Sequence, residues 1–160
     1  MMNRYSILVP IGLMAAFLPA ATCFAGEEDK VREAFKSFQE RVKAKDTARL
    51  WDVLDSSSRQ AADKTAKTYK DAYARAKGEK KKELEKNLGL TADQLANLTG
   101  KAFLRSNKYY GKYHEVPGST IEKVTIDDKK ATVFYKEEDG DKEKLSLVNE
   151  DGKWKVVAAP

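Results

Sequence analysis

The chain has almost none of the residue types on which disulfide, zinc and multi-histidine sites depend. Among its 160 residues there is one cysteine, Cys23, and one histidine, His114. A single cysteine excludes an internal disulfide framework and the paired cysteines of a zinc site. A single histidine excludes metal centres built from several histidines and makes most histidine-based catalysis a poor fit. We therefore expect no metal and no cofactor.

Long apolar runs and common catalytic motifs are also missing. The main apolar run, residues 7–18, is shorter than the ~20 residues that a membrane-spanning helix needs. There is no glycine-rich phosphate loop, no GxSxG and no HExxH. Apolar residues make up 41% of the chain and charged residues 34%, with 30 Lys and Arg against 25 Asp and Glu. This composition is typical of one soluble globular domain, and it names no activity.

Residues 1–25 have the layout of a secretory signal peptide. Arg4 precedes the apolar run, and Cys23 and Ala25 supply the small residues of a cleavage site after Ala25. We expect an exported protein, periplasmic or extracellular, with one domain at 26–160. That mature chain has no cysteine, which suits an oxidising compartment. Two alternatives stay open, in which the segment is kept as a membrane anchor or Cys23 is lipidated.

The first half of the mature chain has helical periodicity. Four apolar residues with spacings of 4, 3 and 4 predict one buried helix face: Val31, Phe35, Phe38 and Val42. Asp46 is placed to cap a short second helix. Residues 59–89 predict a further helix that Gly78 bends or breaks, and Thr91 with Gln94 forms a capping box that opens another.

The pattern changes to alternation after about Thr120. Four short runs alternate apolar and polar residues, at 121–126, 131–135, 145–147 and 154–158. Turn signals of the Asp-Asp and Asp-Gly type separate them, which predicts a four-stranded antiparallel meander. Its apolar face needs a cover, and the N-terminal helices are the elements available. We therefore predict an α+β fold in which N-terminal helices pack on a curved sheet.

Two stretches of the mature chain share the layout of one known fold family. They are FKSFQERVKAKDTARLWDVLDSSSR and KVTIDDKKATVFYKEEDGDKEKLSLVNEDGKWKVVAA, the second ending in a Gly-Lys-Trp-Lys motif. They resemble the first helix pair and the closing strands of the nuclear transport factor 2-like superfamily, a cone-shaped α+β fold. The resemblance is strongest over 30–58 and 120–158, whereas 59–118 is longer and more helical than is usual in the family. It implies a cavity, or an outer sheet face, that serves ligands or dimer contacts.

Enzymes of that superfamily, which resemble ketosteroid isomerases and small dehydratases, place a buried Asp or an Asp–His pair in the mouth of the cone. The weak catalytic candidates here are Asp52, Asp55 and His114. One of the aspartates would act as a base with a raised pKa, or His114 would act as a general base beside Glu115. The paired acids of the hairpin turns are explained by turn chemistry. We expect a cone lined, as core or pocket, by Phe35, Phe38, Trp51, Leu54, Phe103, Phe134 and Trp154.

A cluster of tyrosines interleaved with lysines precedes the strands. It predicts a ligand-binding site near the mouth of the cone, formed by Tyr109, Tyr110, Tyr113, His114 and Trp51. The competing interpretation is that the tyrosine rings only close the core and turn their hydroxyls to water. His114 itself reads as a loop residue.

An extended helical segment at 59–106 is rich in bases. Residues 59–89 hold ten bases and five acids, an excess that would attract anionic surfaces. An ordinary solvated helix, with pairs such as Lys67–Asp71 and Lys81–Glu85, would have the same composition.

Three functions follow from these patterns. The first is an exported non-enzymatic binding or accessory domain, with a small apolar ligand or a protein segment as its partner. The others are a small proton-transfer enzyme of the same fold and an envelope protein that binds anionic surfaces through the basic segment. We expect no specific nucleic-acid partner, and a homodimer formed through the sheet is a further option.

Overall fold

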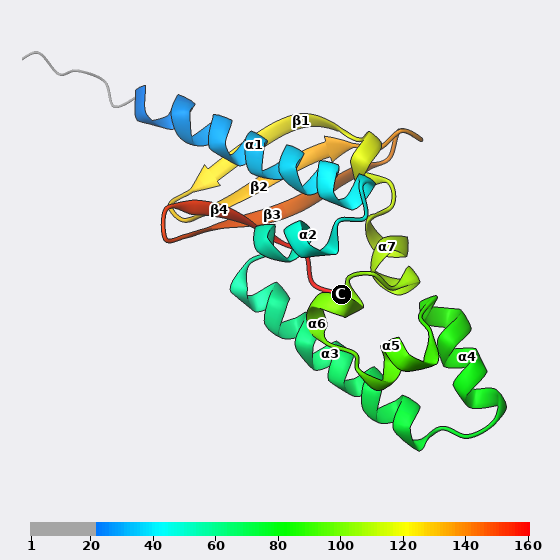
Figure 1. Cartoon of the computed structure of the whole chain (residues 1–160). Helices are drawn as coiled ribbons and strands as arrows, with labels where there is room; N and C mark the ends of the chain where they lie inside the picture. The colour runs from blue at the N-terminus through cyan, green and yellow to red at the C-terminus, as the bar shows by residue number, and fades with distance from the viewer. Residues whose placement is uncertain (1–21) are drawn as a thin grey trace, which may run out of the picture.

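The computed structural model describes residues 22–160, with side chains from Gly26 onward (Figure 1). The predicted signal peptide and its alternatives fall mainly on residues outside this range, so they stay predictions. The first helix, α1, runs from Thr22 to Lys43, so the predicted cleavage point at Ala25 lies in its first turn. Within the described residues, no helix is both long enough and apolar enough to cross a membrane.

The α+β prediction is confirmed. Within residues 22–160 seven α-helices and one 3-10 turn precede a four-stranded antiparallel sheet in the order β1-β2-β3-β4. After α1, the helices are α2 (Thr47–Val53), α3 (Ser56–Arg75), α4 (Glu79–Leu88), α5 (Ala92–Ala96), α6 (Gly100–Phe103), α7 (Asn107–Tyr113) and η1 (Val116–Gly118). The strands are β1 (Thr120–Asp127), β2 (Lys130–Lys136), β3 (Lys142–Glu150) and β4 (Lys153–Val157).

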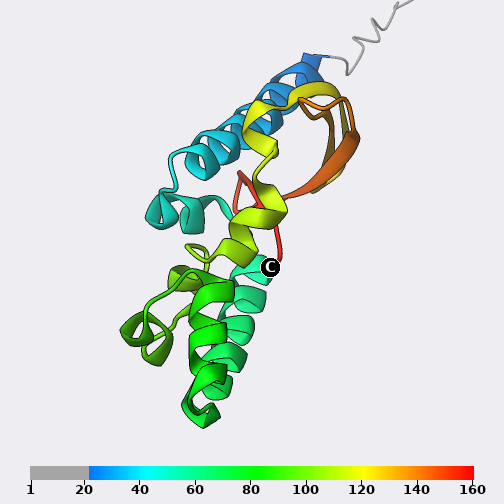
Figure 2. The same ribbon diagram turned by 90° about the vertical axis from the view of Figure 1, so that its right-hand side faces the viewer.

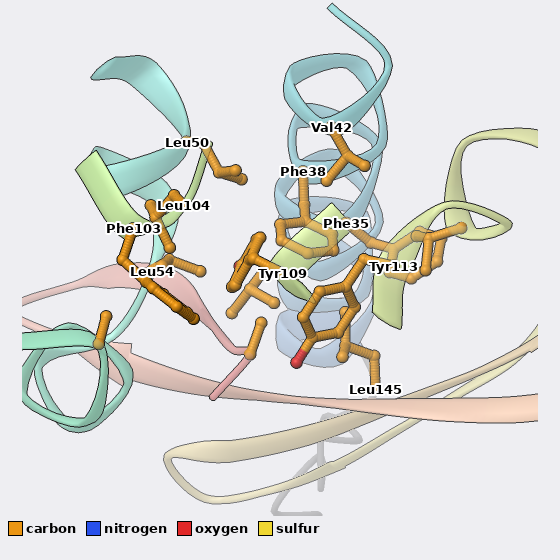
Figure 3. Packing of buried hydrophobic residues seen from close by; sticks show 14 of the residues in the cluster. Phe35, Phe38, Val42, Leu50, Leu54, Phe103, Leu104, Tyr109, Tyr113 and Leu145 are labelled. Carbon is orange, nitrogen blue, oxygen red and sulfur yellow. The ribbon is translucent and has the colours of Figure 1, made fainter. Parts of the chain in front are cut away.

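Helix α1 lies along the concave side of the curved sheet (Figures 1 and 2). Its four predicted apolar residues are all buried, because the 4-3-4 spacing puts them on the face that meets the sheet. The Phe35 ring lies 5.2 Å from the ring of Tyr135 on β2, centroid to centroid. The Phe38 ring meets Tyr113 of α7 edge-on at 5.6 Å. Figure 3 shows Phe35, Phe38 and Tyr113 packed together, with leucines nearby.

Strand alternation corrects one predicted lining residue. Val133 and Tyr135 are buried on the concave side, so Phe134 between them points outward and is 37% exposed. Phe134 therefore does not line the cone, whereas Phe35, Phe38, Leu54, Phe103 and Trp154 are all buried in one cluster. Its register partners on the outer face are Lys123 and Lys144. The homodimer option stays a prediction.

The middle of the chain forms a second body of helices, which we call the helical lobe (residues 56–114). In Figures 1 and 2 it extends away from the sheet, with α4 and α5 near its far end. The predicted break is confirmed, since α3 ends at Arg75 and α4 begins after Gly78, whose φ is 54°. The capping box of Thr91 and Gln94 is also confirmed. The segment 59–106 thus consists of most of the 20-residue helix α3 and the shorter helices α4, α5 and α6, whose buried leucines and aromatic rings belong to the same hydrophobic cluster as α1 and the sheet.

The last strand ties the sheet to the start of the helical lobe. Leu54 forms an isolated parallel bridge with Val156, and the Asp55 N–H donates to the Val156 carbonyl at 3.0 Å. Beyond the strand, the Ala158 N–H donates to the buried Ser58 hydroxyl at 2.9 Å. These bonds hold α3 against the C-terminal end of the chain.

We predict that Phe35→Ala lowers the free energy of unfolding by about 3–5 kcal/mol, because it removes a fully buried ring and leaves a cavity between α1 and the sheet. The matched change Phe134→Ala, on the outer face, is expected to cost less than about 1 kcal/mol. Urea unfolding followed by circular dichroism measures both values. Equal losses would contradict the arrangement of α1 on the concave face.

Candidate functional site

The candidate site is a corner where α1, α7, η1 and the β2–β3 hairpin meet, and we call it the His114 corner. Three hollows there share His114 in their linings. The first, about 510 Å³, is lined by Val42, Lys43, Lys45, Asn107, Tyr110, Gly111 and Pro117. The second, about 440 Å³, is lined by Lys43, Glu115, Pro117, Gly118, Glu138 and Asp139. The third, about 410 Å³, adds Tyr113, Tyr135, Glu137 and Glu143.

The tyrosine cluster forms helix α7, and His114, which the sequence suggested is a loop residue, is the C-cap of this helix. Helix α7 is capped by Ser106, whose hydroxyl accepts from the Tyr109 N–H at 3.3 Å. Residues four apart share a helix face, so Tyr109 and Tyr113 both turn into the core and are 1% and 6% exposed. Tyr110 and His114, one position further along, line the first hollow. The helix therefore divides the predicted ligand-binding tyrosines into core and surface residues.

Tyr110 supplies the aromatic wall of the first hollow. The Lys45 ammonium lies 5.5 Å from the centre of its ring. Its hydroxyl is buried and has no hydrogen-bond partner among the described residues. Burial is the main cause that raises the pKa of this phenol. Trp51 is half-buried on α2 and lines none of the three hollows, so it lies outside the His114 corner.

His114 is fixed in direction but open to solvent. Its Nδ1 lies 2.9 Å from the Gly111 carbonyl, and its Nε2 lies 3.1 Å from Glu115 Oε1. The side chain is 65% exposed. Both ring nitrogens thus have partners, and the imidazole forms part of the rim shared by the three hollows.

The acidic side of the corner holds a carboxyl with an unusual protonation equilibrium. Burial and a hydrogen bond with Glu115 raise the pKa of Glu137 to about 7, with further repulsion from Asp139 and Glu143. Oxygens of Glu115, Glu137 and Asp139 lie within 4.8 Å of one another, close enough for all three to contact one cation. The turn interpretation holds for Asp139, whose carboxylate accepts from the Asp141 N–H at 3.1 Å. The turn interpretation did not predict the raised pKa of Glu137, because no local sequence pattern indicates that Glu115 lies beside it.

The two candidate aspartates of the α2 region have different surroundings. Asp55 is buried, but it is the N-cap of α3 and its carboxylate accepts from the N–H groups of Ser57 and Ser58 at 3.1 and 3.0 Å. Burial alone would raise the pKa of Asp55, yet these hydrogen bonds outweigh burial and lower it. The prediction of a raised pKa is therefore wrong for Asp55, and Asp52 is exposed on α2.

Comparison of this chain with protein-family models, with curated proteins and with solved structures finds no match. The resemblance to the nuclear transport factor 2-like superfamily therefore rests on the two quoted stretches.

We predict that Asp55→Ala lowers the free energy of unfolding by about 1 kcal/mol, because two N–H groups at the start of α3 lose their acceptor. The control Asp52→Ala removes an exposed carboxylate and is expected to change stability by less than about 0.5 kcal/mol. Urea unfolding measures both. A neutral Asp55→Ala would show that the cap contributes nothing to stability.

We predict that Glu137 makes the protein less stable as pH rises from about 4.5 to about 7. Its folded pKa of about 7 lies above the ordinary 4.5, so the folded state holds a proton that the unfolded state has released in this window. The variant Glu137→Gln, which stays neutral, is expected to lose this decline. Urea midpoints at pH 5 and pH 8 measure it, with the exposed neighbour Glu138→Gln as control. Parallel pH curves for the wild type and Glu137→Gln would contradict the prediction.

Proposed function

We propose that this protein is a non-enzymatic binding domain of the nuclear transport factor 2-like type, exported from the cell. Its ligand has an apolar body and an anionic group, and it lies in the first hollow of the His114 corner. The observation that carries the proposal is the pairing of an apolar wall, from Val42, Tyr110 and Pro117, with the cations Lys43 and Lys45 in one lining of about 510 Å³.

The proposed site has the chemistry of a small-ligand pocket. Such sites are mainly apolar, span about 300–1,000 Å³ and carry a few polar groups that orient the ligand. Burial of the ligand's apolar body would supply the affinity. The two ammonium groups, together with the Asn107 amide in the same lining, would orient its anionic end. His114, held by Gly111 and Glu115, would form the rim.

The interior of the cone is filled by side chains, and this favours a ligand site on the surface. Three of the rings predicted to line the cone, those of Phe35, Phe38 and Phe103, are 0% exposed and pack against the rings of Tyr135, Tyr113 and Tyr69. None of these three lines a hollow of the His114 corner. The ligand would therefore lie against the outside of α7, near the sequence segment where we expected it to enter.

A second candidate function, a small proton-transfer enzyme of the same fold, is favoured by one observation. Glu137, with a pKa of about 7, lies beside Glu115 and could accept or release a proton near neutral pH. The binding function fits better, because Glu115 is 44% exposed and Asp55 is committed to capping α3. Water reaches Glu115, the neighbour of Glu137, and this access weakens the use of Glu137 as a base shielded from solvent.

We predict that the protein binds dodecanoate, an anionic amphiphile, and that Gly111→Leu abolishes this binding. Gly111 lies on α7 in the lining of the hollow, and a side chain there meets no atom within 4 Å of its Cβ. Leucine would occupy the hollow without strain and raise helix propensity. The control Ala48→Leu adds the same bulk to an exposed position of α2. Isothermal titration calorimetry measures binding, and thermal unfolding checks that both variants fold.

The cationic part of the site has its own test. The double change Lys43→Gln and Lys45→Gln is expected to weaken dodecanoate binding by about tenfold. The double change Lys36→Gln and Lys123→Gln removes two exposed charges elsewhere and serves as the control. No binding of dodecanoate by the wild type, or unchanged binding by Gly111→Leu, would overturn the proposed site.

A further inference from the structure

The charges of this protein are divided between its two ends. The helical lobe, residues 56–114, holds fourteen bases and six acids, whereas residues 26–55 and 115–160 together hold fifteen bases and nineteen acids. Figures 1 and 2 show that much of the lobe projects beyond the sheet. The elongated molecule therefore has a strongly basic end and an acidic end. Such a field attracts polyanions to one end only.

The bases of the lobe are mostly not neutralised by acids. Of the ten between residues 59 and 89, two have a carboxylate of the described residues within ion-pair distance, Arg59 with Glu150 at 3.6 Å and Lys82 with Glu79 at 3.1 Å. Six further lysines are exposed and form no ion pair within residues 22–160: Lys64, Lys67, Lys70, Lys77, Lys80 and Lys86. This distribution differs from that of a helix stabilised by internal ion pairs.

Both pairs that the sequence suggested are absent, and in one case the structure shows why. The Glu85 carboxylate accepts a hydrogen bond from the Tyr73 hydroxyl at 2.6 Å. The Lys81 ammonium lies over the Tyr73 ring, 4.8 Å from its centre. Glu85 is thus engaged in joining α4 to α3. The other suggested pair, Lys67 with Asp71, forms no contact within ion-pair distance, so Lys67 is open to an external anion.

The arrangement of these lysines suits a flexible partner. Lys64, Lys67 and Lys70, each three residues from the next, form a stripe along one side of α3. The exposed bases continue past the end of α3, through Lys77 and Lys80, to Lys86 on α4. A flexible chain can follow the cations from one helix to the next.

The lobe also lacks the groups that would anchor it in lipid or stack nucleobases. Among the described residues the exposed large apolar side chain is Phe134, on the outer face of the sheet. Of the tyrosines of the lobe, Tyr69 stacks on Phe103 with ring centres 5.8 Å apart and Tyr73, Tyr109 and Tyr113 are buried, while Tyr110 lines the first hollow of the His114 corner. Binding of single-stranded nucleic acid relies on exposed aromatic rings, and membrane insertion relies on exposed apolar ones. The groups that the lobe offers to a partner are therefore charged side chains, without aromatic rings on which bases could stack.

We propose that the helical lobe is a binding surface for an acidic polysaccharide. Lysine ammonium groups, each a point charge on a flexible stem, would contact its sulfate or carboxylate groups one by one, without a fixed sequence of sugars. The proposed polysaccharide surface lies on α3 and α4, whereas the proposed ligand site lies in the His114 corner. The two proposals are therefore tested independently.

The test uses heparin as the probe, with binding measured by isothermal titration calorimetry at low salt and again at rising NaCl concentrations. The wild type is expected to bind heparin and to lose affinity steeply as salt rises, because binding releases counterions. The triple change Lys64→Glu, Lys67→Glu and Lys70→Glu is expected to weaken binding by about tenfold or more. These side chains are exposed and unpaired, so the fold should tolerate the change; circular dichroism checks this.

The matched control reverses three exposed lysines of the sheet end, Lys123→Glu, Lys129→Glu and Lys130→Glu, which alters net charge equally. It is expected to retain most of the heparin affinity. Failure of the wild type to bind heparin at low salt would overturn the proposal. Equal losses in the two triple variants, or tighter binding to duplex DNA or to phosphatidylglycerol vesicles than to heparin, would overturn it as well.

Discussion

The packing of one helix face against a curved sheet is the interaction on which the rest of the structure depends. Val31, Phe35 and Phe38 are completely buried between α1 and the concave side of the strands. A four-stranded meander with an uncovered apolar face would associate with other chains, and α1 alone would be marginal in water. Helix α1 therefore covers the apolar face of the sheet, and the sheet stabilises α1 by burying its apolar face. By fixing the end of α1, this packing also sets where Lys43 and Lys45 lie relative to α7, and so it positions the His114 corner.

The C-terminal end of the chain joins this core to the helical lobe. The bridge between Leu54 and Val156 and the bond from Ala158 to Ser58 hold the start of α3 against the last strand. On the other side, the Tyr113 hydroxyl donates to the Ala159 carbonyl at 2.8 Å. The lobe is thus anchored at its base, while much of its outer surface stays free. That geometry lets one chain present a small-ligand site beside the core and a separate charged surface beyond it.

Local patterns predicted the elements well, because each depends on neighbours within a turn or two. The four-residue apolar stripe of α1, the break at Gly78 and the capping box of Thr91 with Gln94 all follow from spacing alone. The candidate site was predicted less well. Tyr110 and His114 do line a hollow, but Tyr109 became core because α7 is a helix, and Phe134 faces outward because strands alternate. In both cases the sequence indicated the periodicity of the helix or strand, but it did not indicate which face of that element would be buried.

The sequence by itself determined that helices precede a four-stranded meander, the turns between its strands and the excess of bases in the middle of the chain. Only the tertiary structure decided which charges are paired and which are not. Glu115 and Glu137 lie far apart in the sequence, and packing of η1 against the β2–β3 hairpin brings them close enough for Glu115 to help raise the pKa of Glu137. Glu85 is likewise engaged by Tyr73 of a different helix, although Lys81 was the nearer candidate in the sequence. Electrostatic energy depends on distances of a few ångströms between side chains, and such distances between remote segments are set by the packing of the core.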